Sequence, residues 1–166
     1  MNIRLLTLSL VAVFALVAAQ EESVTVVLEA YLVTTVTNED GEVEEVFTEA
    51  TEAKPGQTVE YRVVVGNDSD DTLPAGTVVV TGPVPGTTFY LTDTAAQEPD
   101  SFKTEFSADG GESFSELPVM ITVTNEDGVE EEVAADPASF SAVRWTLLDA
   151  LAPESAHTFT YRVEVK

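Results

Sequence analysis

The sequence contains no cysteine and few basic residues. Seven Lys and Arg stand against 30 Asp and Glu in 166 residues, which gives a formal net charge of −23. So negative a surface repels nucleic acid phosphates and anionic lipid head groups, and we expect neither nucleic acid nor an anionic membrane surface as a partner. The absence of cysteine excludes disulfides, thiol catalysis and thiolate metal sites, so the fold must be stabilised by packing.

Residues 1–19 have the pattern of a secretion signal. Arg4 precedes an apolar run over residues 5–18, and the small residues Val17-Ala18-Ala19 stand before Gln20. The alternative interpretation is a transmembrane anchor, but the run is short for a spanning helix, which needs about 20 residues, and two glutamates follow it. We therefore expect removal of this segment and export of the protein, to the periplasm, the medium or the cell surface.

The rest of the chain has strand patterns and no helical period. In residues 58–65 the side chains of Val59, Tyr61, Val63 and Val65 fall on one face, and mostly polar side chains fall on the other. The same reasoning predicts strands over residues 23–37, 42–51, 58–65, 77–81, 87–91, 102–106, 113–117, 119–124, 129–134, 140–148 and 158–165. This spacing is typical of an all-β, immunoglobulin-like β-sandwich of about ten short antiparallel strands.

Residues 20–166 are expected to form a single domain, because a chain of this length can bury one core. The predicted core consists of alternating apolar positions: Val59, Tyr61, Val63, Val78, Val80, Phe89, Val143, Trp145, Phe159, Tyr161 and Val163. Residues 92–101 have loop composition and are expected to form an exposed loop.

Two Pro-Gly motifs and the strands beside them resemble a known family. Residues 53–67 (AKPGQTVEYRVVVGN) and 78–90 (VVVTGPVPGTTFY) are similar to the DUF11 conserved-repeat domain of prokaryotic cell-surface proteins. Three later segments resemble its closing strands: 106–114 (FSADGGESF), 142–145 (AVRW) and 151–165 (LAPESAHTFTYRVEV). The sequence has Thr81 and Gly82 where the family often has an Asp before the Pro of the second motif. The resemblance implies a β-sandwich module at a cell surface.

Two pairs of segments resemble each other within the chain. Residues 35–42 (TVTNEDGE) match 122–129 (TVTNEDGV), and residues 58–65 (TVEYRVVV) match 158–165 (TFTYRVEV). The first and second segments are separated by 23 residues in one half of the chain and by 36 in the other. The unequal spacing favours one sandwich with similar hairpins over two half-size repeats, each of which would have little core of its own.

The strand predicted over residues 23–37 is apolar on both faces. Val24, Val26 and Leu28 lie on one face, and Val27 and other apolar residues lie on the opposite face. Such a strand needs cover on both sides. We expect residues 20–52, which continue into a hairpin, either to pack within the domain or to extend from it and pair with another subunit.

Few residues are candidates for chemistry. His157 is the only histidine, and no Gly-x-Ser-x-Gly motif supplies a nucleophile for it, so we interpret it as a surface residue and expect no enzyme activity. Asp68, Asp70 and Asp71 form an acidic turn whose oxygens could bind Ca²⁺, although turn formation already accounts for the pattern. No other cofactor is expected.

Three arginines stand beside core positions on predicted strands. If their strands are neighbours, Arg62, Arg144 and Arg162 could form an ion ladder with Glu60 and Glu164 on the outer face of a sheet. The functional alternative is a site for a polyanion. In so negative a protein we favour the structural interpretation.

These features predict a non-catalytic, secreted or cell-surface module for envelope architecture, adhesion or surface assembly. Its expected partner is a protein or another component of the cell envelope, with strand-mediated self-assembly as one mode of binding. The alternatives are a weak extracellular calcium- or ligand-binding module and a secreted hydrolase.

Overall fold

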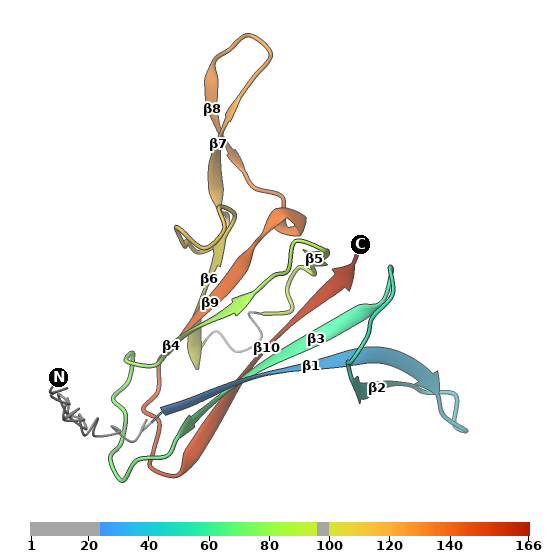
Figure 1. The fold of residues 1–166 in the computed structure, drawn as a ribbon, viewed down its shortest axis with the longest axis vertical. Coiled ribbons are helices and arrows are strands. Elements are labelled where there is room, and N and C mark those ends of the chain that lie inside the picture. Colours follow the sequence, from blue (N-terminus) through green and yellow to red (C-terminus); the bar gives the residue numbers. More distant parts are fainter. Residues whose placement is uncertain (1–23, 96–99) are drawn as a thin grey trace, which may run out of the picture.

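The computed structural model describes residues 24–95 and 100–166, so the predicted signal segment 1–19 lies outside the described residues (Figure 1). The elements are β1 (Val24–Thr37), β2 (Val43–Glu49), β3 (Thr58–Asn67), β4 (Val79–Pro83), β5 (Thr88–Tyr90), β6 (Phe102–Ser107), β7 (Met120–Thr124), β8 (Glu130–Ala134), a 3₁₀ turn η1 (Pro137–Ser139), β9 (Ala142–Leu147) and β10 (Ser155–Val165). The predicted all-β class is confirmed.

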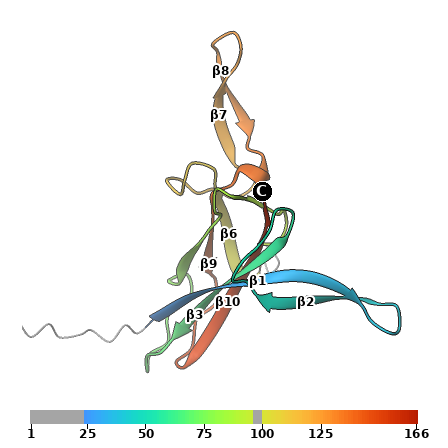
Figure 2. The same ribbon diagram turned by 45° about the vertical axis from the view of Figure 1, so that its right-hand side comes forward.

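The strands form two packed sheets and a separate ribbon. One sheet has five strands in the order β2-β1-β3-β10-β5, and the other has three in the order β4-β9-β6. The ribbon β7-β8 projects away from both sheets (Figures 1 and 2). All pairings are antiparallel, as expected for a β-sandwich.

The core lies between the two sheets. Trp145 of β9 stacks on Phe159 of β10 with ring centroids 5.4 Å apart, and both side chains are fully buried. Nine of the predicted core residues are buried: Val59, Val63, Val78, Val80, Val143, Trp145, Phe159, Tyr161 and Val163. Alternation along the long strands therefore identified most of the core correctly.

Two of the predicted core residues are not fully buried in the structure. Phe89 is 41% exposed, because the three-residue strand β5 turns Thr88 and Tyr90 inward and Phe89 outward. Tyr61 is half-buried, and its ring stacks on Tyr161 at 5.2 Å. The prediction for Phe89 was wrong because so short a strand does not define its own phase.

Gly82 fits closely against two core rings. A Cβ at this position would lie 2.7 Å from Cε1 of Tyr161 and 3.0 Å from the ring of Trp145. Any larger side chain would collide with them. Glycine at this position therefore has a packing reason, since an aspartate side chain has no room here.

One predicted strand is absent. Residues 113–117 form only an isolated bridge between Ser115 and Phe106. The preceding loop is held instead by Asp109, whose carboxylate accepts hydrogen bonds from the hydroxyl and the backbone N–H of Ser113. These bonds hold the pKa of Asp109 well below its usual range. Local side-chain bonding thus replaces the ladder that the apolar pattern suggested.

The loop predicted over residues 92–101 is partly internal. Ala95 is 1% exposed, and its carbonyl accepts a hydrogen bond of 2.9 Å from the indole Nε1 of Trp145. Residues 96–99 lie outside the described residues. The expectation of an exposed loop was therefore wrong for Ala95.

The two sequence echoes correspond to similar local structures. In the β1-β2 turn, Oδ1 of Asn38 accepts backbone N–H bonds from Asp40 and Glu42 at 3.1 and 2.9 Å. Asn125 makes the equivalent bonds in the β7-β8 turn, both at 3.0 Å. The second pair, β3 and β10, are neighbours in one sheet, with Tyr61 directly opposite Tyr161. The second echo is thus a pair of neighbouring strands, whereas the first is a shared turn structure in two separate hairpins.

Candidate interaction surfaces

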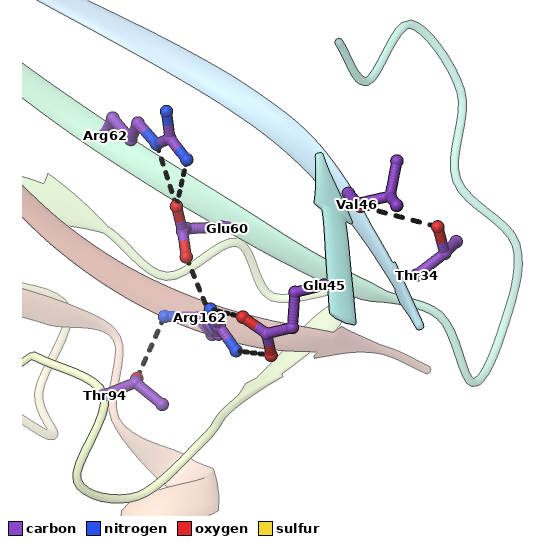
Figure 3. Close-up of polar contacts among 7 residues, drawn as sticks. All are labelled: Thr34, Glu45, Val46, Glu60, Arg62, Thr94 and Arg162. Carbon is purple, nitrogen blue, oxygen red and sulfur yellow. Dashed lines mark hydrogen bonds and ion pairs between the residues drawn. The ribbon is translucent and has the colours of Figure 1, made fainter. Parts of the chain in front are cut away.

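Four charged residues form an ion ladder on the outer face of the five-stranded sheet: Glu45, Glu60, Arg62 and Arg162 (Figure 3). Arg162 contacts Glu60 through Nε at 2.9 Å and both oxygens of Glu45 through its terminal nitrogens at 2.7 Å. The other oxygen of Glu60 accepts from Arg62 at 2.8 Å. Each cation of the ladder is thus bonded to a carboxylate.

The ladder shows that the β1-β2 hairpin curls over the sheet. β1 and β3 separate β2 from β10 in the sheet order, yet Glu45 of β2 meets Arg162 of β10. The curl leaves Glu60 only 6% exposed. The hydrogen bond from Arg162 lowers the pKa of Glu45, and the same bond raises the pKa of Arg162, so both groups are charged across the physiological range.

Aromatic rings complete this contact. The guanidinium of Arg62 lies over the rings of Tyr31 and Phe47, 4.4 and 4.9 Å from their centroids. Cation–π contacts of this kind add to the ion pairs at partly desolvated sites. The ladder and the rings together hold the hairpin against the sheet.

The predicted ladder is only partly correct. Arg144 lies on β9 of the other sheet, where it pairs with Glu105 at 2.9 Å and its guanidinium lies over the ring of Phe114. Glu45, which the sequence did not suggest, occupies the place predicted for Glu164. Alternation indicated which side chains point outward but not which strands are neighbours.

Two hollows lie on the surface, one at each sheet. A hollow of about 660 Å³ beneath the β1-β2 hairpin has a mixed lining of polar and apolar residues. Arg162 is among them, and its backbone N–H donates to Thr94 at 2.9 Å. An apolar groove of about 420 Å³ runs beside β6, where Leu117 and Leu148 are about half exposed. The carboxylate in the lining of the first hollow, Glu45, is bonded to Arg162.

Asp68, Asp70 and Asp71 lie exposed in the turn after β3. This turn is organised by the buried Asn67, whose amide donates to the carbonyl of Asp71 at 2.8 Å and to that of Leu151 at 3.0 Å. Within residues 24–95 and 100–166, no three Asp, Glu or His side chains gather closely enough to hold a metal ion. The calcium site stays a prediction without a preformed ligand set.

His157 is half-buried and not a surface residue as predicted. Its ring packs against Phe159 at 4.6 Å and Phe102 at 5.9 Å. In the described part of the chain, Nε2 is buried without a hydrogen-bond partner. This aromatic packing gives the residue a structural role.

The first half of β1 is exposed on both faces. Val26, Val27 and Leu28 are 58%, 51% and 47% exposed. β2 pairs only with the second half of β1, from Tyr31 to Thr37. Among the described residues, the segment from Val24 to Glu29 therefore has β3 on one side and no strand on the other. We call this segment the open edge.

Comparison with protein families, curated proteins and solved structures found no match. The resemblance to DUF11 domains therefore stays a prediction based on the motifs quoted above. Among the described residues no helix is long and apolar enough to cross a membrane.

Proposed function

We propose that this protein is an exported, non-catalytic module that binds another protein or an envelope component through its β1-β2 hairpin. The observation that supports this most strongly is the gathering of exposed apolar side chains on that hairpin: Val26, Val27, Leu28, Val36, Val43, Val46 and Phe47. Exposed apolar surface of this extent commonly marks an interaction site. So many exposed apolar side chains on one hairpin are unusual in a chain that has 30 acidic residues.

The remaining chemistry supports a binding role over catalysis. The ring of His157 is packed between the aromatic side chains of Phe102 and Phe159. The carboxylates of Glu45, Glu60 and Glu105 are each bonded to arginine. These groups stabilise the fold, and none is poised to move a proton to or from a substrate.

The predicted location agrees with this role. The signal-like segment, the strongly negative charge and the absence of cysteine suit a protein that must stay soluble outside the cell without disulfides. A sandwich with a projecting ribbon and an apolar hairpin offers surfaces for attachment, as in the cell-surface domains that the sequence resembles.

Cosedimentation with envelope fragments tests this function. The purified chain is mixed with envelope from cells that do not produce it, and the pelleted fraction is measured. We expect Val36→Glu combined with Val43→Glu to reduce pelleting to background, because both side chains lie on the outer part of the hairpin and are 46% and 69% exposed.

Val129→Glu combined with Val79→Glu is the matched control, since it adds the same charge at side chains that are 56% and 51% exposed elsewhere. Equal pelleting by both double variants, or no pelleting of the unmodified chain, would contradict a role of this hairpin in attachment.

A further inference from the structure

Exposed strand edges in stable proteins are usually protected by charge, proline, short length or a covering segment. The outermost strands of both sheets have such protection. β2 presents three glutamates, β5 has three residues, β4 ends at Gly82-Pro83, and β6 is bridged to Ser115. In the ribbon, β8 contributes three consecutive glutamates beside β7. Residues 155–161 of β10 also have β3 on one side and no described strand on the other, because β5 pairs with β10 only from Val163, and β7 carries no charge. The open edge differs from both in having three consecutive exposed apolar side chains, Val26, Val27 and Leu28.

The open edge has no lysine, no proline and a single charge, at Glu29. The backbone N–H and C=O groups of alternate residues in this segment point away from β3. The carbonyl of Ala30 accepts from the N–H of Ala50 at 2.9 Å, on the side of β1 occupied by β2. Because backbone polar groups alternate along a strand, those of Val24, Val26 and Leu28 point to the same side, where none of the described strands lies.

The side chains of the open edge extend an apolar row of the sheet. Val26 lies opposite Val65 and Leu28 opposite Val63, both of which are buried on the core-facing side. The three-stranded sheet does not cover this end of the row, so Val26 and Leu28 are left about half exposed. A strand added here would cover them only if its own side chains were apolar on the same face.

We propose that the open edge pairs with the open edge of a second copy of this chain, in antiparallel orientation about a two-fold axis at Val26. This proposal goes beyond the proposed function, because it assigns a second copy to the open edge, which lies outside the part of β1 that pairs with β2. The pairing joins two five-stranded sheets into one continuous sheet and places the apolar row of one copy beside that of the other. The interface is isologous and therefore closes at a dimer.

The register follows from the backbone. Outward groups on both copies belong to even-numbered residues, so hydrogen-bonded pairs must join an even residue to an even residue. Ala50 already occupies the position opposite Ala30, which limits the pairing to residues before Ala30. The longest register that satisfies both conditions places Val26 opposite Val26 and Val24 opposite Leu28.

Charge makes association with a second copy depend on salt. In the proposed register Glu29 lies beyond the paired residues 24–28, so no carboxylate faces another among these residues. The net charge of −23 on each copy opposes association at low salt. Screening weakens that repulsion as the Debye length falls from about 30 Å at 0.01 M to about 10 Å at 0.1 M. Dimerisation should therefore increase with salt.

Sedimentation equilibrium of the full purified chain, from about 10 µM to about 1 mM at two NaCl concentrations, measures the association. We expect a monomer–dimer equilibrium that is stronger at the higher salt. Val26→Lys should weaken dimerisation at least about tenfold, because it adds a charge on the axis of the pairing. Leu28→Lys serves as a second variant with the same expected effect.

Val79→Lys is the matched control, since Val79 is 51% exposed on a different strand and the charge change is the same. It should dimerise like the unmodified chain. A chain that stays monomeric at every concentration and salt, or equal dimerisation of Val26→Lys and Val79→Lys, overturns the proposal. So does a complex with a different protein at this edge while the purified chain alone is monomeric.

A cysteine scan tests the register, since the chain has no native cysteine. Opposed residues in a hydrogen-bonded antiparallel pair have Cα atoms about 5.5 Å apart, within the range that a disulfide can span. Val26→Cys should therefore form linked dimers readily under mild oxidation, whereas Thr25→Cys and Leu28→Cys should form few. A maximum at either neighbouring position, or linkage equal to that of Val79→Cys, contradicts the register.

The outcomes separate this inference from the proposed function. A chain that binds envelope through its hairpin but never dimerises overturns the second copy as partner and leaves the function standing. A chain that dimerises at Val26 but does not bind envelope overturns the proposed function and leaves the dimer standing.

Discussion

Replacing Trp145 with alanine should lower the free energy of unfolding by about 3–5 kcal/mol, the range for emptying a large buried aromatic site. Trp145 is 0% exposed, stacks on Phe159 and lies 5.6 Å from the ring of Tyr161. The substitution also leaves the carbonyl of Ala95 without its indole donor. Chemical denaturation of the variant and the unmodified chain, followed by circular dichroism, measures the difference.

Trp145→Phe separates the two contributions, because it keeps most of the ring volume and removes only the indole N–H. Its cost should be smaller, about 1–3 kcal/mol, as expected for a buried acceptor left unpaired. The fluorescence of Trp145 is a second check, since it is the only tryptophan in the chain. An emission maximum typical of water-exposed indole, or a loss below about 1 kcal/mol for Trp145→Ala, would contradict the packing described here.

Arg162→Met should lower the free energy of unfolding by about 2–4 kcal/mol, between the values for exposed and for buried ion pairs. The Arg162 side chain is 23% exposed and the Glu60 side chain is 8% exposed. Its removal leaves Glu60 with Arg62 alone and releases Glu45, so the β1-β2 hairpin loses its bond to β10. Thermal and urea denaturation measure the change.

Arg144→Met is the matched control, because it makes the same change in charge on the other sheet, where Arg144 pairs with the less buried Glu105. It should cost less than Arg162→Met. A double-mutant cycle with Glu45→Gln isolates the contact between hairpin and sheet. If the coupling between Glu45 and Arg162 is zero, the hairpin is not held over the sheet by this contact.

Alternation along strands predicted the class of fold and most of the core. Val63, Trp145 and Tyr161 were identified because long strands repeat their inward positions many times. Phe89 was missed because β5 is too short for its phase to be recognised. Alternation of apolar residues therefore predicts burial reliably in long strands. It fails for a three-residue strand, whose orientation is set by the strands beside it.

The ladder shows what local pattern could not supply. The outward position of Arg162 follows from the inward positions of Tyr161 and Val163, but its contact with Glu45 depends on the curl of a hairpin three strands away in the sheet order. The place of Arg144 on the other sheet likewise depends on topology. Long-range pairing in a β-sheet is set by the whole chain and leaves no signal in one strand.

The open edge was foreseen only in part. The sequence indicated that the strand containing Val26 is apolar on both faces and left open whether it is covered. β3 pairs with one side of β1, and β2 ends at Glu49. These two facts decide which half of β1 has an unpaired side. That division depends on hairpin length and register, which the turn at Asn38 determines locally.

Fractionation of the producing cell, combined with the intact mass of the protein in each fraction, tests the central claim most directly. We predict that the protein is found in the medium, the periplasm or the cell surface, with a mass that corresponds to a chain beginning at Gln20, allowing for cyclisation of that glutamine. Protein that remains in the cytoplasm and retains residues 1–19 would contradict the assignment to an exported structural module.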